Sequence, residues 1–323
     1  MPLLSVQDLH VHYRLPPASW LAKAPRLHAV NGVGFELEAG RTLGVVGESG
    51  CGKSTLARAL LGLVSPTSGE LYLDGTPLGP LGRKRPPGLR RRMQMVFQDP
   101  IASLDPRMTV GRLLAEPLRA FEPRLGAAER RRRVLTMMER VGLHPQQINR
   151  YPHEFSGGQC QRIGIARALM PGPDLLVCDE PVSALDVSIQ AQIVNLLMEL
   201  QQSLGLALVF IAHDLAVVKQ ISHRVLVMYL GRVMEEGPTE RLFRAPAHPY
   251  TQALLAAVPL PDPRRERNKP PPPLKGEPPS PLTPPSGCPF HDRCPRARPP
   301  CDHQPPPLHH LGHGHRVHCH FPH

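Results

Sequence analysis

Nine residues, GESGCGKST (Gly47–Thr55), constrain the fold of this chain more than any other part of its sequence. They match the pattern G-x-x-x-x-G-K-[ST]. An apolar run typical of a buried strand, Thr42–Val46, precedes them, and a helical pattern, Ser54–Val64, follows at once. A strand, a glycine-rich turn and a helix in this order favour a mostly parallel α/β sheet. The backbone N–H groups of such a turn can surround a polyphosphate, which the dipole of the following helix also attracts.

The residues of this turn predict an ATP site. Lys53 supplies a positive charge for the β- and γ-phosphates and is expected to be catalytic, and the Ser54 hydroxyl is a candidate Mg²⁺ ligand. A chance match in a glycine-rich turn is the alternative, but it does not explain the flanking strand and helix. The remaining members are expected to surround the nucleotide phosphates: Gly47, Glu48, Ser49, Gly50, Cys51, Gly52 and Thr55.

Two adjacent carboxylates end a later apolar run, DLLVCDE (Asp174–Glu180), about 125 residues after the glycine-rich turn. Successive side chains of a strand point to opposite faces, so Asp179 and Glu180 can act on different atoms. Asp179 is suited to hold Mg²⁺ through water, and Glu180 is suited to polarise an attacking water as the catalytic carboxylate. An acidic pair after an apolar run is often only a strand end that meets solvent. Its position after the glycine-rich turn favours the functional interpretation.

Patterns elsewhere extend the α/β interpretation over residues 1–258. Alternating apolar residues predict a strand over Leu3–Tyr13, and Leu206–His213 predicts another buried strand after a helix. Residues 99–168 have a helical pattern, which predicts a helical subdomain inserted into the core. From Pro259 to Pro307 there are 19 prolines, too many for a helix or a central strand. We therefore expect residues 259–323 to form a separate, extended C-terminal arm.

A third motif, FSGGQCQR (Phe155–Arg162), offers open backbone N–H groups and a serine hydroxyl to an anion. With this motif, the chain resembles the ATP-binding subunit of ABC transporters, in which S-G-G-Q is the family signature. Phe155 stands where leucine is commoner. The resemblance implies that the signature acts in trans, in the ATP site of a partner subunit. Its residues here are Ser156, Gly157, Gly158 and Gln159.

Four further positions match motifs of the same family, and the resemblance implies their roles. Gln98 in VFQDP resembles the glutamine that contacts Mg²⁺ and water and relays to the membrane subunits. His213 in IAHD resembles the catalytic histidine that contacts the γ-phosphate. Asp186 in SALD lies in the loop that crosses the dimer interface. Tyr13 is the candidate for stacking on adenine, although it could simply pack on its own sheet.

Several segments narrow the resemblance to oligopeptide/dipeptide importers, most closely to the second ATPase subunit of a dipeptide importer. Similar segments are His248–Leu255, Asp99–Arg107, Ser280–Pro295 and the insertion about residues 16–28. The implied fold is a P-loop NTPase with a parallel-sheet core, an N-terminal antiparallel β portion, an inserted helical subdomain and a Pro-rich C-terminal extension. The implied function is ATP hydrolysis, with Mg²⁺, that energises uptake of dipeptides or oligopeptides across the cytoplasmic membrane.

The resemblance also implies partners and a location. We expect a heterodimer with a homologous ATPase subunit, bound to two transmembrane permease subunits. An extracytoplasmic peptide-binding protein is expected to deliver peptides to these permease subunits. The apolar runs are far shorter than the ~20 residues needed to span a bilayer, and the first residues lack the pattern of an export signal. The expected place is therefore peripheral, on the cytoplasmic face of the inner (plasma) membrane.

Two alternative functions stay open at this point. The same motor could serve another cargo, such as nickel, glutathione or an antimicrobial peptide. A soluble ABC ATPase acting on nucleic acid or ribosomes would suit the formal net charge of +11. Such proteins usually carry two nucleotide domains or a long coiled coil, so we expect no direct contact with nucleic acid. The arginine runs Arg83–Arg92 and Arg130–Arg133 are expected to be solvated faces.

Four of the seven cysteines lie near the C-terminus with the spacing C-x5-C-x6-C-x17-C. Four thiolates are the usual ligands of a [4Fe–4S] cluster and would also suit structural zinc. Zinc sites usually contain tighter cysteine pairs, and the ATPases that this tail resembles are associated with an iron–sulfur cluster. We therefore expect [4Fe–4S], with Zn²⁺ as the alternative. Nearby histidines could substitute as ligands, although a solvated polar tail is the simpler interpretation of the last 21 residues. The expected ligands are Cys288, Cys294, Cys301 and Cys319.

Overall fold

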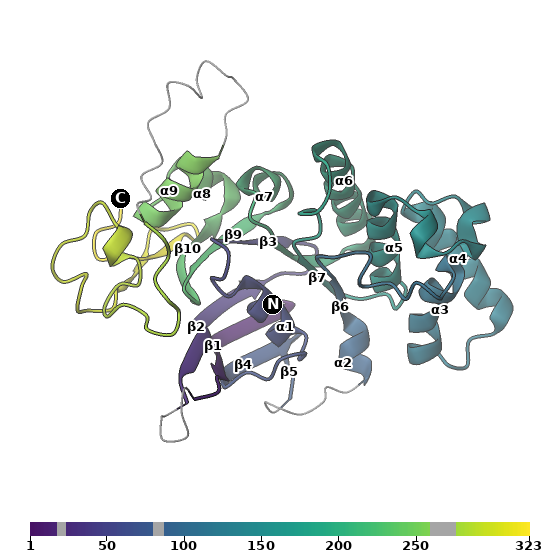
Figure 1. Ribbon diagram of the computed structural model, residues 1–323, viewed down its shortest axis with the longest axis horizontal. Coiled ribbons are helices and arrows are strands. Elements are labelled where there is room, and N and C mark those ends of the chain that lie inside the picture. Colours follow the sequence, from purple (N-terminus) through teal and green to yellow (C-terminus); the bar gives the residue numbers. More distant parts are fainter. Residues whose placement is uncertain (18–23, 80–86, 259–275) are drawn as a thin grey trace, which may run out of the picture.

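The computed structural model describes residues 1–17, 24–79, 87–258 and 276–323, and contains two sheets with helices around them (Figure 1). The larger sheet has the strand order β11-β12-β10-β9-β3-β8-β7-β6. Its strands from β6 to β9 in that order are parallel, and the three strands beyond β9 are antiparallel. The strands are β3 (Thr42–Val46), β6 (Met93–Val96), β7 (Leu175–Asp179), β8 (Ala207–Ile211), β9 (Arg224–Tyr229), β10 (Arg232–Pro238), β11 (Leu308–His310) and β12 (Arg316–His318).

The parallel strands are apolar because both faces of the larger sheet are covered. Every residue of β3, β7 and β8 is buried. Alternate residues of β7 belong to two different hydrophobic cores. Leu175 and Val177 pack in the core shared with the N-terminal residues of the chain, and Leu176 and Cys178 pack in the core formed with the helices on the other face. This is the arrangement expected of a parallel sheet between two layers, and it explains the unbroken apolar runs in the sequence.

The smaller sheet is the expected N-terminal antiparallel portion, with the order β2-β1-β4-β5. Helix α1 (Lys53–Leu60) packs with it, and Leu56 and Leu60 are fully buried in the shared core. The phosphate-loop helix is thus held between two sheets. The strands are β1 (Leu4–Arg14), β2 (Arg26–Leu37), β4 (Ser68–Leu73) and β5 (Thr76–Pro77).

Helices form the other side of the molecule and one of its ends (Figure 1). Residues 99–168, all of them described, contain helices and turns but no strand, as the sequence predicts. These helices are α3 (Val110–Phe121), α4 (Ala127–Arg140), η1 (Pro145–Asn149), η2 (Pro152–Glu154) and most of α5 (Gly157–Leu169). The others are α2 (Pro87–Arg92), α6 (Val187–Leu204), α7 (Leu215–Ile221), α8 (Thr239–Arg244), α9 (Pro249–Ala257) and η3 (His291–Arg293).

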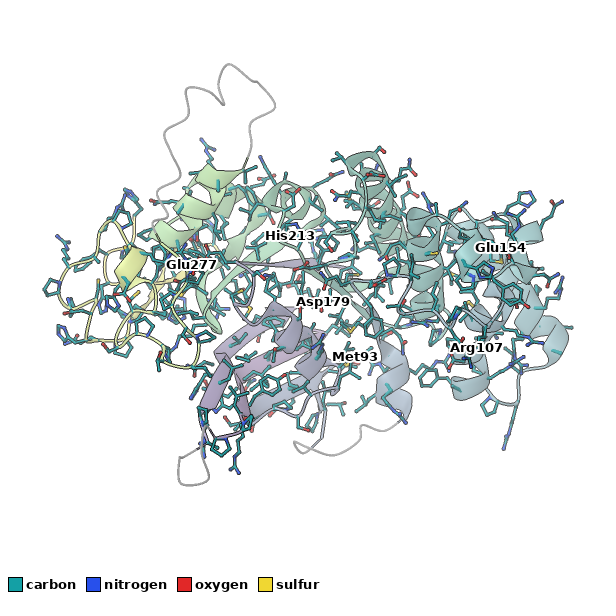
Figure 2. The ribbon with its side chains drawn as sticks, viewed as in Figure 1. Met93, Arg107, Glu154, Asp179, His213 and Glu277 are labelled. Atoms are coloured by element: carbon teal, nitrogen blue, oxygen red, sulfur yellow. The ribbon has the colours of Figure 1, made fainter. Side chains whose placement is uncertain are left out.

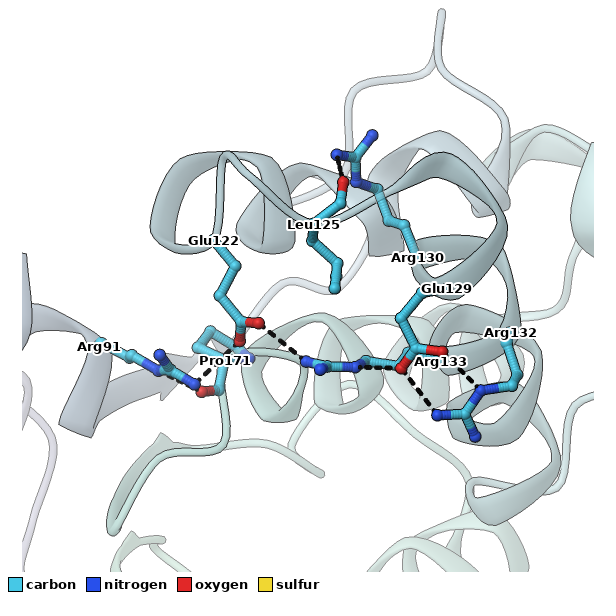
Figure 3. A network of polar contacts seen from close by, with 8 residues as sticks. All are labelled: Arg91, Glu122, Leu125, Glu129, Arg130, Arg132, Arg133 and Pro171. Carbon is cyan, nitrogen blue, oxygen red and sulfur yellow. Dashed lines mark hydrogen bonds and ion pairs between the residues drawn. The ribbon is translucent and has the colours of Figure 1, made fainter.

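The arginine runs are half-exposed and partly paired, rather than simply solvated (Figure 3). Glu122, at the end of α3, accepts hydrogen bonds from Arg91 (2.9 Å) and from Arg133 (3.0 Å). Glu129 accepts from both Arg132 and Arg133. Exposed pairs of this kind add little stability, but those of Glu122 connect α2, the end of α3 and α4. Residues 83–86 of the first run lie outside the described residues.

The described part of the C-terminal extension is packed on the core, which corrects the expectations of an extended arm and of a solvated tail over the last 21 residues. Residues 259–275, which include the predicted domain boundary, lie outside the described residues. The part from 276 onward packs on the α/β core, and β12 pairs with β10, so that Val317 lies opposite Glu235. The prolines do not prevent this pairing because β11 and β12 lie between Pro307 and Pro322, in a stretch without proline.

A buried polar cluster fastens this tail to the core. The Glu235 side chain is fully buried and accepts hydrogen bonds from the backbone N–H groups of Ala247 (2.7 Å) and His248 (3.0 Å). Its carboxylate also contacts His315 Nε2 at 2.7 Å, and the His315 side chain is only 2 % exposed. The next residue, Glu236, pairs with Arg224 and Arg316. The histidine-rich tail is therefore part of the folded structure, because His315 and Arg316 have buried carboxylates of β10 as partners.

Candidate nucleotide-binding site

The predicted site residues follow neighbouring parallel strands, whose carboxyl ends meet at one edge of the larger sheet. The glycine-rich turn follows β3, Gln98 follows β6, Asp179 and Glu180 end β7, and His213 follows β8. In Figure 2, Asp179 and His213 both lie near the centre of the molecule. The topology thus brings together residues that are far apart in the sequence.

The glycine-rich turn curls around the ammonium group of Lys53, which is 5 % exposed. Lys53 Nζ donates to the carbonyl oxygens of Gly47 (2.7 Å) and Glu48 (3.0 Å). A Cβ atom at Gly47 would lie 2.2 Å from the Met228 carbonyl oxygen. Gly52 adopts φ 104°, a left-handed conformation that favours glycine. The glycines therefore allow a loop tight enough to place the lysine at its centre.

Two oxygen-bearing side chains next to this loop fit a magnesium ion. The Ser54 hydroxyl donates to Asp179 Oδ1 at 3.0 Å, and Asp179 is 4 % exposed. Burial raises the pKa of the Asp179 carboxyl, whereas the hydrogen bond from Ser54 lowers it. Mg²⁺ prefers oxygen ligands and usually binds through one or two protein groups together with substrate phosphates. This chemistry agrees with the ligands predicted from the sequence.

Three predicted residues from three different loops meet at one carboxylate. Gln98 Nε2 donates to Glu180 Oε2 at 3.2 Å, and His213 Nδ1 lies 3.6 Å from the same oxygen. Glu180 has φ 48°, a conformation that is uncommon for a residue with a side chain. Backbone strain of this kind often occurs at functional sites. The arrangement can orient the Glu180 carboxylate toward a water molecule.

The signature residues lie elsewhere, at the start of α5. The Ser156 hydroxyl accepts from Gln159 N, and the Gln159 side chain accepts from Ser156 N at 3.0 Å, so the two residues cap the helix reciprocally. Glu154, two residues before Ser156, lies among the helices at one end of the molecule in Figure 2, away from Asp179. The structure therefore does not join the signature to the phosphate loop of the same chain.

The signature instead adjoins the loop predicted to cross a dimer interface. A Cβ atom on Gly157 would lie 3.5 Å from the Leu185 side chain, and one on Gly158 would lie 2.5 Å from Ile189. In the same loop Asp186 is exposed, and Val187 is 82 % exposed. The signature and this loop, with Val187 at the start of α6, therefore lie next to each other at the surface.

Tyr13 is half-buried near the end of β1, opposite Leu27 of β2, and it packs on the core of the smaller sheet. This placement suits simple packing as well as stacking, so its contact with adenine stays a prediction. Part of the predicted insertion, residues 18–23, lies outside the described residues.

Two residues that the sequence analysis missed hold the phosphate loop from the C-terminal side. Arg293 donates to both carboxylate oxygens of Glu48, at 2.6 and 3.0 Å. The backbone N–H of Glu48 donates to the Tyr250 hydroxyl at 3.0 Å. No local pattern indicates these contacts, because the partners are more than 200 positions apart in the sequence.

The four C-terminal cysteines line one cavity of about 10 Å³, together with His291 and His320. Burial raises the pKa of the Cys288 thiol to about 12. The four cysteines therefore border one space, although they come from positions up to 31 residues apart. Within the described residues, however, no three His, Cys, Asp or Glu side chains are arranged to hold a metal ion. The predicted ligand types are in place, but the geometry of a metal site is not. The other three cysteines, Cys51, Cys160 and Cys178, are buried in the core.

Two family descriptions match the chain. Residues 30–183 match "ABC transporter", and residues 234–301 match "Oligopeptide/dipeptide transporter, C-terminal region". The oligopeptide transport ATP-binding protein OppF of Haemophilus influenzae is 56 % identical over 98 % of this chain and 96 % of its own length. The dipeptide transport ATP-binding protein DppF of Escherichia coli is 51 % identical over 98 % of this chain and 94 % of its own length.

Two solved structures are similar to the structure of this chain. CbiO1 of Clostridium perfringens, part of the ABC transporter complex CbiONQ, has a TM-score of 0.65 and 30 % identity, covering 75 % of this chain and 91 % of that chain. The ATP-binding cassette MJ0796, a dimer bound to ADP and Pi, has a TM-score of 0.65 and 28 % identity, covering 73 % of this chain and 98 % of that chain. These similarities confirm the predicted α/β fold of a P-loop NTPase.

Proposed function

Because the chain belongs to the ABC transporter ATP-binding family, in its oligopeptide/dipeptide branch, we propose that it binds and hydrolyses ATP to drive peptide uptake. The observation that carries this proposal is the meeting of Lys53, the Ser54–Asp179 pair and the Glu180 cluster at one sheet edge. ATP and Mg²⁺ are the substrate and cofactor that such a site fits.

The geometry supports a division of roles among these residues. Lys53 offsets charge on the β- and γ-phosphates, and Ser54 and Asp179 would hold Mg²⁺, which neutralises further charge on the phosphates. Glu180 orients a water molecule toward the γ-phosphorus, while Gln98 and His213 fix its carboxylate. Water adds to the γ-phosphorus and gives up a proton to the Glu180 carboxylate, while the bond from phosphorus to the β–γ bridging oxygen breaks. ADP leaves with the electron pair of that bond, and the γ-phosphoryl group becomes inorganic phosphate.

We propose that the partner of this chain is a homologous ATPase subunit, in a heterodimer. The support is the single surface formed by Ser156, the signature glycines and the exposed loop at Asp186. This surface can complete the ATP site of a partner, whereas Lys53 and Glu180 need a signature from the other chain. We also propose a nucleotide-binding domain, 1–258, and an extension, 259–323, whereas the two matched families cover residues 30–183 and 234–301.

Because each proposed ATP site needs residues of two chains, we expect the isolated protein to hydrolyse ATP slowly. Turnover per chain should rise with protein concentration or with added partner subunit. Ser156→Ala in this chain should impair the partner's ATP site. A dimer of one Ser156→Ala chain and one Lys53→Ala chain has one ATP site in which both Lys53 and the opposing Ser156 are intact. Mixing the two variants should therefore restore part of the activity in any such dimer that they form. Turnover measured against concentration checks this, with Ser203→Ala on α6 as a control. A monomer that is fully active at all concentrations would contradict the proposal.

We propose that the contact with the permease subunits is a groove of about 330 Å³ beside Gln98. Leu63 and Phe97 line it and are 61 % and 41 % exposed. An apolar groove of this size suits an amphipathic helix of a membrane subunit. Among the described residues, no helix has the length and apolar character needed to cross a membrane. The proposed place of the chain is therefore peripheral, on the cytoplasmic face of the inner membrane.

For the cargo, we propose dipeptides or oligopeptides, because the names of OppF and DppF refer to these substrates. We further propose that an extracytoplasmic peptide-binding protein delivers them. Nickel, glutathione and antimicrobial peptides are the competing cargoes, and identifying what the associated binding protein retains would distinguish them. The relatives reported above are transport proteins, which disfavours the alternative of a nucleic-acid- or ribosome-associated ATPase.

We also propose that Cys288, Cys294, Cys301 and Cys319 bind a [4Fe–4S] cluster, with Zn²⁺ as the alternative. The support is their common cavity. Its small volume and the geometry of the side chains mean that the surrounding loops must rearrange to admit a cluster.

Anaerobically purified protein is expected to be brown and to contain iron and acid-labile sulfide in equal amounts. Cys288→Ser should remove the colour, whereas Cys160→Ser, which alters a buried cysteine on α5, should retain it. Metal analysis and absorption spectra check this prediction. Colourless protein with stoichiometric zinc would favour the alternative, and protein without either metal would refute both.

A further inference from the structure

Glu48, the second residue of the glycine-rich turn, is held by α9, at the end of the nucleotide-binding domain, and by η3, in the C-terminal extension. Arg293 on η3 binds both oxygens of its carboxylate, and Tyr250 on α9 accepts a hydrogen bond from its backbone N–H. A guanidinium group that binds a carboxylate through two parallel hydrogen bonds fixes its orientation as well as its charge. The C-terminal extension therefore contacts the phosphate loop directly.

Arg293 is itself held rigidly. Its side chain is 6 % exposed, and Nη1 also donates to the Tyr229 hydroxyl at 3.3 Å. Its helical turn begins after Phe290, which is 1 % exposed and packs against the rings of Tyr229 and Tyr250 at 5.4 and 5.2 Å. The arginine can therefore transmit the position of the extension to the loop, because its buried side chain is hydrogen-bonded to Tyr229 and to Glu48 at the same time.

The position of Glu48 matters for phosphate binding in two ways. Its carbonyl oxygen accepts a hydrogen bond from Lys53 Nζ, so a shift of Glu48 also moves the lysine. Its carboxylate is only 23 % exposed, and in a loop that binds a polyphosphate an unpaired negative charge would repel the ligand. Arg293 removes both problems by holding and neutralising this carboxylate.

We propose that Arg293 is a positioning residue for ATP binding, which acts from the C-terminal extension by fixing Glu48 of the phosphate loop. The proposal rests on the proposed function, in which Gly47–Thr55 binds ATP. It gives the extension a role in the nucleotide site of its own chain, in addition to any role in transport.

Isothermal titration of the full-length chain with MgATP tests this role. Arg293→Gln should raise the Kd for MgATP about tenfold, which corresponds to about 1.4 kcal/mol. Arg293→Lys, which keeps the charge but loses the paired hydrogen bonds, should raise it about threefold, a smaller effect. The matched control is Arg316→Gln, which breaks another arginine–carboxylate pair of the extension, with Glu236, away from the loop. It should loosen the tail in thermal unfolding but leave the Kd unchanged.

A double-mutant cycle separates positioning from general stability. If Arg293 acts through Glu48, Arg293→Gln should have little further effect in a Glu48→Gln background. The inference is overturned if folded Arg293→Gln and Arg293→Lys both bind MgATP as the unmodified chain does, or if the effect persists in full in that background. If Lys53→Ala binds MgATP as tightly as the unmodified chain, the proposed function itself fails. Should Arg293→Gln not fold, Arg293→Lys and the cycle built on it decide the question.

Discussion

Replacing Glu180 by glutamine is expected to leave ATP binding intact and to lower turnover by about 10²–10⁴-fold. The amide has nearly the same shape as the carboxylate, so the contacts to Gln98 and His213 can largely remain. It lacks the negative charge that orients and polarises water. The assembled dimer should therefore stay closed around unhydrolysed ATP, which size-exclusion chromatography and retained radiolabelled nucleotide would detect.

Two comparisons make this result specific. Lys53→Ala should fail earlier, at nucleotide binding, because it removes the charge at the centre of the phosphate loop. Glu199→Gln, on an exposed position of α6, makes the same chemical change away from the site and should keep normal turnover. Near-normal hydrolysis by Glu180→Gln in the assembled transporter would exclude Glu180 as the catalytic carboxylate.

The second large effect is expected from Glu235→Ala, which should lower the free energy of unfolding by about 3–5 kcal/mol. The substitution leaves the backbone N–H groups of Ala247 and His248 and the ring of His315 without their buried acceptor. Each unsatisfied buried group costs about 1–3 kcal/mol, and the lost side chain adds a small cavity. Chemical denaturation gives the total effect, and hydrogen exchange should show that β11 and β12 open first.

The neighbouring residue provides a control for this prediction. Glu236 is also buried in β10, but its partners Arg224 and Arg316 have about a third of their side chains exposed. These arginines can turn to water when the carboxylate is removed. Glu236→Ala should therefore cost less, about 1–2 kcal/mol. Equal losses for both variants would mean that the partners of Glu235 do not depend on it as the structure implies.

Much of the nucleotide site could be predicted from the sequence because its parts are local. The glycines before Lys53 and the strand and helix around them form one continuous unit, whose conformation depends on neighbouring residues. The same is true of Asp179 and Glu180 at the end of an apolar strand. The parallel order of the strands then requires these units to meet at one edge, so that Gln98 and His213 reach Glu180. The spacing of the four C-terminal cysteines predicted a metal site, whereas the described side chains only line one small cavity and do not form a metal-binding group.

The folding of the C-terminal extension was decided by tertiary structure alone. Its prolines and histidines indicate a solvated arm, yet His315 is buried against Glu235, 80 positions earlier, and Arg293 reaches Glu48, 245 positions earlier. Polar residues have no periodic pattern that marks them for burial, because their burial becomes favourable only when a distant partner satisfies them. The amino-acid sequence therefore determined which local segments can bind phosphate and water. Only the folded chain determined that Arg293 of the extension holds the phosphate loop at Glu48.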